Sequence, residues 1–450
     1  MRFFNSLSKK IEIFPKQESV NIYSCGPTVY DFVHIGNLRT FLFEDLLIRT
    51  LKDNAYNIVH TRNITDIDDK TIKHAQEQNI SLSEFTNKYT EEFFTDLKNL
   101  NFDQSSTTYL KATDYIQPMI NMIQKLIDNN YAYETEDGVY FKTSSFNHYG
   151  DFAGLNLENI QQGASGHNSD FTKEDFGDFV LWKKYKKSDG CVYWESAWGK
   201  GRPGWHTECA AMVQHQYPKG LDIHTGGIDL LFPHHTNEKA HCECLSSKAM
   251  SKFWLHTTHL LVDNQKMSKS LGNFYTVRDL IEKGFDYKTI RFYLQTEAHY
   301  RSSLNFTLEG LKGANSALKR INNFICEIIE KPSTATNNQL KEKFDSHLHD
   351  DLNIPRAMGE IFTTINNFYH GIIIDTESTL QDLKKINQIL EVFSFPQETI
   401  LNNITQKLYD LRIIARKEKN WSESDRLRDE LLLHGIEIRD NKDSVSIRKI

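Results

Sequence analysis

The chain has 450 residues, of which 25% are charged and 39% are hydrophobic, and its formal net charge is −7 at pH 7. That length is enough for roughly two to four domains with buried cores, and the composition is ordinary for a globular protein in water. No apolar run reaches the roughly 18 residues of a membrane span, and the N-terminus lacks a signal-peptide pattern, so we expect a cytoplasmic protein without a membrane partner.

The N-terminal part of the chain has the pattern of a βαβ unit. A buried strand is predicted over 20–23, an amphipathic helix over 38–51 and a second strand over 57–63. Parallel strands joined by a helix are typical of a doubly wound sheet, and a βα pattern returns near residue 201. The fold class predicted is therefore α/β, with a Rossmann-like parallel-sheet domain built from residues 1–113 and 191–304.

The rest of the chain is predicted to form three further parts. Residues 114–190 combine a helix with strand-like pieces and a loop rich in Gly, Ser and Asn over 161–170, which favours an insertion in the first domain. Residues 305–400 have apolar side chains at helical spacing, from Leu311 onward, and are predicted to form a helical bundle. Residues 401–450 combine two amphipathic helices with an alternating segment, which predicts a small α/β domain.

One motif lies where the first predicted strand leads into the helix. Residues 27–37 contain His34, Gly36 and Asn37. Free N–H groups at a helix start attract phosphate, a glycine lets the backbone approach a nucleotide, and an imidazole can donate to phosphate oxygens. A His-x-Gly at a helix start is by itself more often structural, so this interpretation depends on a second motif.

The second motif is the sequence KMSKSLGN, which begins at Lys266 and repeats a lysine at Lys269. Two ammonium groups on a mobile loop can neutralise the charge that develops on a leaving pyrophosphate. Two lysines alone would indicate a solvated basic turn. The Met-Ser between them, the Leu-Gly-Asn after them and the upstream His34 motif together favour ATP-dependent chemistry.

A third group of residues has the composition of a metal site. Cys25 follows the first strand, Cys209 ends the segment GWHTEC, and His234 and Glu238 are four residues apart and share one helical face. Two thiolates, an imidazole and a carboxylate suit Zn²⁺. The spacing alone leaves the ligand set open, because other candidate ligands lie nearby. These are His235, His241, Cys242 and Cys244.

Five segments together resemble the cysteinyl-tRNA synthetases, a family of class I aminoacyl-tRNA synthetases. They are CGPTVYD from Cys25, NITDIDDK from Asn63, GRPGWHTEC from Gly201, FPHH from Phe232 and KMSKSLGNF from Lys266. The resemblance runs from about Tyr23 to the C-terminus. It implies that residues 1–113 and 191–304 form the catalytic domain, where His34, Lys266 and Lys269 stabilise the transition state electrostatically. The ATP-binding residues that it implies are His34, Gly36, Asn37, Lys266 and Lys269.

The same resemblance selects one metal-ligand set and assigns the substrate pocket. The zinc ligands implied are Cys25, Cys209, His234 and Glu238. Zinc would bind the thiolate of the substrate L-cysteine, which serine cannot imitate, so no editing domain is required. The residues implied to line the cysteine pocket are Thr65, Trp205, His224 and Asp229. The acidic run Asp66, Asp68 and Asp69 is expected to be structural, with Mg²⁺ arriving bound to ATP.

The tail resembles the anticodon-binding region of the family. Arg416, Asp425 and Asp440 are the candidates for contacts with exposed anticodon bases, although a solvated helix face is the plainer alternative for each. Two positions depart from the family pattern. Thr225 stands where relatives often have glycine and is expected to alter the nucleotide pocket slightly, and Ile447 stands where many have tryptophan, which removes one base-stacking contact.

The resemblance implies that the chain activates L-cysteine with ATP as cysteinyl-adenylate and transfers it to the 3′-terminal adenosine of tRNA(Cys), as a monomer. Three alternatives share some of these motifs. A ligase that joins cysteine to a glucosamine–inositol acceptor lacks the anticodon-binding tail. A cofactor-making nucleotidyltransferase lacks the four zinc ligands, and a non-catalytic RNA-binding paralogue usually loses the ATP motifs.

Overall fold

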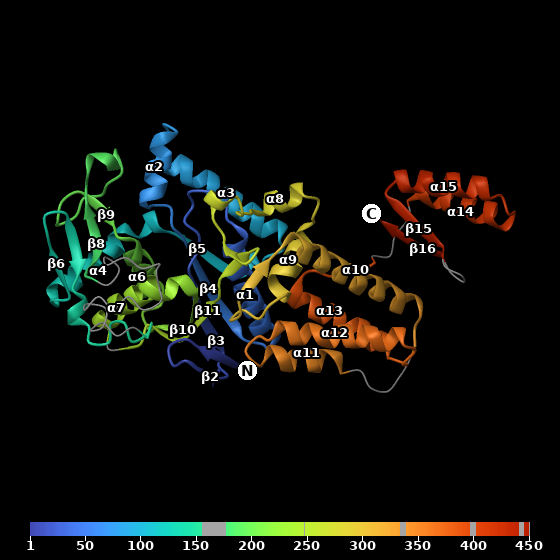
Figure 1. Ribbon diagram of the computed structural model, residues 1–450, viewed down its shortest axis with the longest axis horizontal. Helices are drawn as coiled ribbons and strands as arrows, with labels where there is room; N and C mark the ends of the chain where they lie inside the picture. Colours follow the sequence, from blue (N-terminus) through green and yellow to red (C-terminus); the bar gives the residue numbers. More distant parts are fainter. Residues whose placement is uncertain (155–176, 247, 334–338, 397–401, 441–444, 450) are drawn as a thin grey trace.

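The computed structural model describes residues 1–154, 177–246, 248–333, 339–396, 402–440 and 445–449 (Figure 1). The Gly-, Ser- and Asn-rich loop predicted over 161–170 lies outside these residues. The described part of the chain contains no helix with the length and apolar character needed to cross a membrane.

A five-stranded parallel sheet forms the centre of the molecule. Its strands are β3 (Ser19–Ser24), β4 (Asn57–Ile64), β5 (Thr107–Lys111), β10 (Leu221–Gly227) and β11 (Ser251–Thr257). The spatial order is β11-β10-β3-β4-β5, and every neighbouring pair is parallel. The order reverses direction between β3 and β10, so the predicted doubly wound sheet is confirmed, with its topological switch point beside the first strand.

Alternate side chains of β3 fix which helices cover each face of this sheet. Ile22 packs with Leu47 of α1 (Ile35–Asp53), the helix that connects β3 to β4. Tyr23 points to the other face, where its hydroxyl lies 3.7 Å from the sulfur of Met212 in α6. The helices in that second layer are α4 (Ile116–Asp128), α6 (Trp205–Gln216) and α7 (Thr236–Leu245).

The acidic run after β4 has the structural role that was expected for it. Asp68 caps α2 (Asp69–Glu77), accepting from the backbone N–H of Lys70 at 2.9 Å within a capping box. Asp66 is buried and accepts two hydrogen bonds from Thr113, at 2.9 Å and 2.6 Å. Helix α3 (Leu82–Asn99) follows. These carboxylates therefore hold the loops at the carboxyl edge of the sheet.

The predicted insertion contains an antiparallel four-stranded sheet, seen at the left of Figure 1. Its strands are β6 (Ala132–Glu134), β7 (Gly138–Phe141), β8 (Phe179–Lys184) and β9 (Gly201–Pro203). The sheet thus extends past the predicted boundary at residue 190, because β9 pairs with β8. Gly204 follows β9 and connects this sheet directly to α6.

The remaining elements surround this core. The N-terminal hairpin has β1 (Arg2–Asn5) and β2 (Lys10–Ile13). A small sheet has β12 (Leu260–Val262), β13 (Gln265–Lys266) and β14 (Leu304–Phe306), with α8 (Val277–Glu282) and α9 (Tyr287–Thr296) between the last two strands. The bundle has α10 (Leu308–Glu330), α11 (Leu340–Leu348), α12 (Ile354–Tyr369) and α13 (Thr376–Leu390).

The C-terminal unit is a helix pair with a hairpin. It consists of α14 (Asn403–Lys417), α15 (Trp421–Leu433), β15 (Ile436–Asp440) and β16 (Val445–Lys449). Leu431, Ile436 and Ile438 form its own small core, and it stands at the far right of Figure 1, beyond the bundle. The helical bundle and the α/β character of the tail agree with the sequence pattern.

A fully buried arginine joins the parallel-sheet domain to the bundle. Arg291 of α9 donates to the carbonyls of Leu100 at 2.8 Å and Leu390 at 2.7 Å and forms an ion pair with Asp45 of α1. The guanidinium group therefore pairs with a buried carboxylate and supplies hydrogen bonds to two backbone carbonyls at helix ends.

We expect Arg291→Met to lower the free energy of unfolding by about 3 kcal/mol, because the buried Asp45 keeps Arg49 but loses its other arginine partner, and the carbonyls of Leu100 and Leu390 lose their donor. Denaturant unfolding followed by circular dichroism measures the change. The control is Arg320→Met, at an exposed arginine of α10, which we expect to stay within about 0.5 kcal/mol of the parent. Equal losses in the two variants would contradict this account.

Candidate active site

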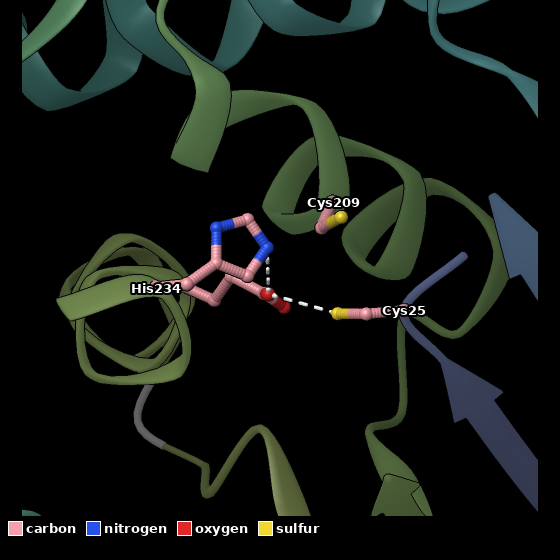
Figure 2. Close-up of side chains that lie close together, drawn as sticks. Cys25, Cys209 and His234 are labelled. Carbon is pink, nitrogen blue, oxygen red and sulfur yellow. Dashed lines mark hydrogen bonds and ion pairs between the residues drawn. The ribbon is translucent and has the colours of Figure 1, made fainter. Parts of the chain in front are cut away.

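Four side chains that are far apart in the sequence converge at the carboxyl edge of the central sheet. Cys25 follows β3, and Cys209 lies in the first turn and a half of α6. His234 lies in the segment before α7, and Glu238 lies in the first turn of α7. One ligand atom from each lies within 4.8 Å of the others, and all four residues are buried. Figure 2 shows Cys25, Cys209 and His234 converging from these separate elements. This cluster could hold a metal ion.

The Glu238 carboxylate connects the members of the cluster. Its Oε1 lies 2.9 Å from His234 Nε2 and 3.6 Å from Cys25 Sγ. Its Oε2 lies 2.9 Å from Nε2 of His224. Burial alone would raise the pKa of Glu238, but the two imidazoles outweigh burial and hold that pKa well below its usual range. The carboxylate is therefore ionised.

The protonation states in the cluster suit a divalent cation. Burial lowers the pKa of His234, but Glu238 and Cys209 together raise it to about 10. A hydrogen bond from Cys25 lowers the pKa of Cys209 to about 6, whereas burial raises that of Cys25. The site therefore contains the Cys209 thiolate and the Glu238 carboxylate beside protonated His234 and Cys25. His234 and Cys25 would release their protons when a metal ion binds. The donor set of two sulfurs, one nitrogen and one oxygen fits Zn²⁺.

A second group of ligand atoms overlaps the first. It consists of Cys25, His224, His235 and Glu238. His235 Nδ1 lies 2.8 Å from His256 Nε2, and His206 Nδ1 lies 2.9 Å from His234 Nδ1. Hydrogen bonds to the second ring nitrogen orient metal-binding imidazoles in proteins. The other candidates left open by the sequence, His241, Cys242 and Cys244, belong to neither group among the described residues.

A glycine is required beside Cys25 because two backbones approach closely there. A Cβ on Gly26 would lie 1.7 Å from the carbonyl oxygen of Asn63, and the Gly26 N–H donates to Asn63 Oδ1 at 2.7 Å. The Asn63 side chain also donates to Thr65 Oγ1 at 3.0 Å. Gly26 and Asn63 thus fix the position of Cys25. Both residues lie in the motifs found in the sequence, but the sequence did not reveal this role.

The His34 motif lies at the N-terminus of α1, as predicted. His34 caps the helix, and its Nδ1 accepts from the backbone N–H of Asn37 at 3.2 Å. Burial lowers the pKa of His34 to about 4, partly opposed by Asp229. The imidazole is therefore neutral, with Nδ1 as an acceptor and Nε2 carrying the proton. It can donate from Nε2 toward an anion at this helix start.

The lysine loop lies directly against this motif, although the two are far apart in the sequence. A Cβ on Gly36 would lie 3.2 Å from Cε of Met267 and 3.0 Å from the His34 ring. The backbone N–H of Ile35 donates to the carbonyl of Tyr275 at 3.0 Å. Lys269 forms an ion pair with Asp31. The structure thus brings the two ATP-type motifs together at one edge of the sheet.

The residues predicted for the cysteine pocket occupy three different places. Trp205 is about 40% exposed, and its ring lies 4.3 Å from that of His234, while His224 is buried against Glu238. Asp229 follows β10 and acts electrostatically on His34. Thr65 is buried and bridges to Thr28. Trp205 and His224 therefore border the metal-type cluster, and Asp229 borders the helix start.

The predicted anticodon residues are partly engaged within the tail. Arg416 Nη1 lies 2.8 Å from Asp440 Oδ2, and Arg412 Nη2 lies 2.5 Å from the same oxygen. Asp425 is exposed on α15 and forms an ion pair with Arg428 at 3.3 Å. Ile447 pairs with Ile438 in the hairpin, and its side chain lies outside the described part of the structure.

Thr225, the other departure from the family pattern, belongs to a buried polar network that crosses the sheet. Its hydroxyl donates to Glu44 Oε1 at 2.9 Å and lies 2.7 Å from Ser24 Oγ. Ser24 Oγ lies 2.9 Å from His60 Nε2, and His60 Nδ1 lies 2.8 Å from Thr107 Oγ1. The side chain therefore faces α1, beneath the sheet, and is accommodated by hydrogen bonds there.

Comparison with known proteins places this arrangement in one class. The family model described as "tRNA synthetases class I (C) catalytic domain" matches residues 12–316. The fold is similar to a crystal structure of methionyl-tRNA synthetase from Mycobacterium tuberculosis, with a TM-score of 0.58 at 12% identity over 83% of this chain and 88% of that chain. The parallel sheet with both motifs at its carboxyl edge is thus the catalytic architecture of the class I synthetases.

Full-length relatives define the family within that class. A cysteine–tRNA ligase of Brachyspira hyodysenteriae is 44% identical over 470 residues, and one of Chlamydia trachomatis is 44% identical over 475 residues. Each alignment covers 99% of this chain and 99% of the relative. The chain belongs to the cysteine–tRNA ligase family, a family of aminoacyl-tRNA synthetases. The family, the fold class and the enzyme class predicted from the sequence are confirmed, and the three alternatives are not favoured.

The buried network makes stability depend on pH. Burial holds the pKa of His60 well below its usual range, so the folded protein keeps this ring neutral while the unfolded chain takes up a proton near pH 6.5. Stability is therefore fully present above that pH and is lost as the pH falls. We expect His60 alone to contribute a loss of about 2 kcal/mol between pH 7 and pH 5.

The variant His60→Gln keeps a polar side chain but does not titrate, so its unfolding free energy should fall less steeply over this interval. Denaturant unfolding of both proteins at several pH values measures the difference. Parallel pH profiles would show that His60 does not have the lowered pKa.

Proposed function

We propose that this chain activates L-cysteine with ATP and transfers it to the 3′-terminal adenosine of tRNA(Cys), and that Cys25, Cys209, His234 and Glu238 bind one Zn²⁺. The observation that carries the proposal is the buried four-donor cluster beside the switch point of the sheet. Ligands of doubly wound folds bind at that edge. The His34 and Lys269 motifs border the same edge, so an amino acid and ATP would meet there.

The metal gives the pocket its selectivity in this proposal. Bound Zn²⁺ would supply a soft acceptor for the thiolate of L-cysteine, which the hydroxyl of serine does not match. Trp205 covers His234 and limits access of water, while His224 holds Glu238 through the 2.9 Å contact. Thr65 and Asp229 would complete the pocket, with Asp229 directed to the amino group or to the adenosine.

The nucleotide motifs would act by electrostatics and positioning. A carboxylate oxygen of L-cysteine attacks the α-phosphorus of ATP, and the bond to pyrophosphate breaks. His34 would donate a hydrogen bond from Nε2, and Lys266 and Lys269 would neutralise the charge on the leaving pyrophosphate. Gly36 and Asn37 would present the helix start to the phosphates, and Mg²⁺ would arrive bound to ATP. No side chain has to become a covalent nucleophile.

The second step would use the tail to select the tRNA. The hydroxyl of the terminal adenosine attacks the activated carbonyl, and AMP leaves. Arg416, Asp425 and Asp440 are the proposed anticodon contacts, of which Arg416 and Asp440 would be presented as one ion-paired unit. We further propose that the protein acts as a cytoplasmic monomer and that the insertion between the two halves of the catalytic domain runs from residue 114 to the end of β9 at Pro203.

The direct test is cysteine-dependent exchange of labelled pyrophosphate into ATP without tRNA. We expect exchange with L-cysteine and at least about a hundredfold less exchange with L-serine. A hydrophobic slot discriminates between such similar side chains by roughly 10- to 200-fold, and a metal–thiolate bond should favour cysteine more strongly than such a slot does. No exchange from folded, zinc-loaded protein would overturn the catalytic part of the proposal. Equal exchange with serine would overturn the role assigned to the metal.

The ligand set is tested by matched cysteine variants. We expect Cys209→Ser to lose bound zinc, measured by elemental analysis after dialysis, and to unfold at a lower temperature, because metal binding stabilises the folded state. Cys242→Ser, at a buried thiol that belongs to neither ligand group, should keep one zinc per chain. Retention of zinc by Cys209→Ser would favour the alternative group that contains His224 and His235.

A further inference from the structure

We propose that Asp31 is a positioning residue for Lys269, and that its carboxylate weakens the binding of ATP before the reaction starts. Asp31 would hold the ammonium group at the mouth of the nucleotide site and compete with phosphate oxygens for it. The inference rests on the proposed function, because it concerns how the lysine loop meets ATP.

Asp31 is fixed by two separate contacts. Its Oδ1 accepts from the backbone N–H of Phe32 at 2.8 Å, and its Oδ2 forms the ion pair with Lys269. The side chain of Asp31 is 27% exposed, whereas that of Lys269 is 60% exposed. The carboxylate is therefore the fixed partner, and the lysine is the group that can move away from it.

The loop that carries Lys269 has a defined shape of its own. The backbone N–H of Ser268 donates to Asn273 Oδ1 at 2.8 Å, and Asn273 Nδ2 donates to the carbonyl of Lys266 at 3.2 Å. Gly272 closes the turn with a φ of 66°, in the left-handed region that favours glycine. The side chain of Asn273 thus stabilises the turn through two hydrogen bonds to its backbone, and Asp31 orients the side chain of Lys269.

The segment that carries Asp31 is held between α8 and α3 through its neighbour Phe32. The guanidinium of Arg278 lies 4.2 Å from the centre of the Phe32 ring and pairs with Glu92 and Asp96 of α3. The Phe32 ring also lies 5.5 Å from that of Tyr89. The segment on which Asp31 lies is therefore held from both sides, so its carboxylate cannot simply follow the lysine when the lysine moves.

These contacts set up a competition for one positive charge. The phosphates of ATP and the carboxylate of Asp31 both attract the ammonium group of Lys269, and they repel each other at close range. The pair is partly exposed, so its influence on ATP affinity should be small, about twofold to fivefold. A purely structural role would have the opposite sign, because loosening the loop would weaken ATP binding.

The test compares Asp31→Asn with the parent in the cysteine-dependent exchange assay. Asparagine keeps an oxygen that accepts from the Phe32 N–H but removes the charge. We expect KM for ATP to fall about twofold to fivefold, with a smaller change in kcat, and amide hydrogen exchange over residues 266–273 to become faster. An unchanged or raised KM would overturn the proposal.

Two further variants make the result specific. Asp263→Asn removes one negative charge from an exposed turn of the neighbouring hairpin, and it should leave KM for ATP unchanged. In a Lys269→Gln background, Asp31→Asn should change equilibrium binding of ATP less than it does in the parent. Equal effects in the two backgrounds would mean that Asp31 does not act through Lys269.

The parent protein separates this inference from the proposed function. If the parent shows no cysteine-dependent exchange, the proposed function fails. If the parent is active and Asp31→Asn leaves KM for ATP unchanged or raises it, only the role assigned to Asp31 fails.

Discussion

The site depends on one buried negative charge. Glu238 is fully buried and ionised, and a carboxylate in that position is tolerated only when it is paired. His224 from β10 and His234 from the segment before α7 supply that pairing, and Cys25 after β3 completes it. Strand, loop and helix are thus tied to a single side chain. Because a buried charge without partners would be strongly destabilising, these polar side chains surround Glu238 in the interior.

The order of the strands determines where ATP and the amino acid can meet. Because the sheet reverses direction between β3 and β10, the loops after these strands diverge and leave space at their carboxyl ends. Cys25 lies on one loop, Asp229 lies on the other, and α1 starts beside both. In the proposed reaction the metal-type cluster would supply the chemistry that distinguishes one amino acid from another, and the helix start would attract phosphate. The two functions are separate in their residues but share one edge.

Much of this arrangement could be predicted from the sequence, and the reasons for success are local. The βαβ unit follows from hydrophobic periodicity, which predicted the helix over 38–51. Helix α1 begins earlier, at Ile35, because His34 caps it and the capping residue has no part in the apolar pattern. The resemblance to a known family supplied the choice of His234 over His235. Spacing alone could not make that choice, since both imidazoles lie in groups that include Cys25 and Glu238.

The parts that could not be predicted depend on contacts between distant segments. The pairing of β9 with the insertion sheet was missed because three residues carry no periodic signal. The contact of Asp31 with Lys269, and that of Arg416 with Asp440, join surface loops or separate elements whose meeting no local pattern indicates. Thr225 was expected to affect the nucleotide pocket, but a strand residue points to one face or the other, and the sequence did not reveal which.

The polar network beneath the sheet has a consequence for the accuracy of the site. Ser24, His60, Thr107 and Thr225 come from four adjacent strands, and their hydrogen bonds form only when all four strands are aligned at one level. Successive side chains of a strand alternate between faces, so a slip of β3 by one residue would turn Cys25 away from Cys209. Apolar contacts would tolerate such a slip more easily than hydrogen bonds do. The hydrogen bonds on one face of the sheet therefore help to fix the strand register. That register places the thiols of Cys25 and Cys209 together on the opposite face.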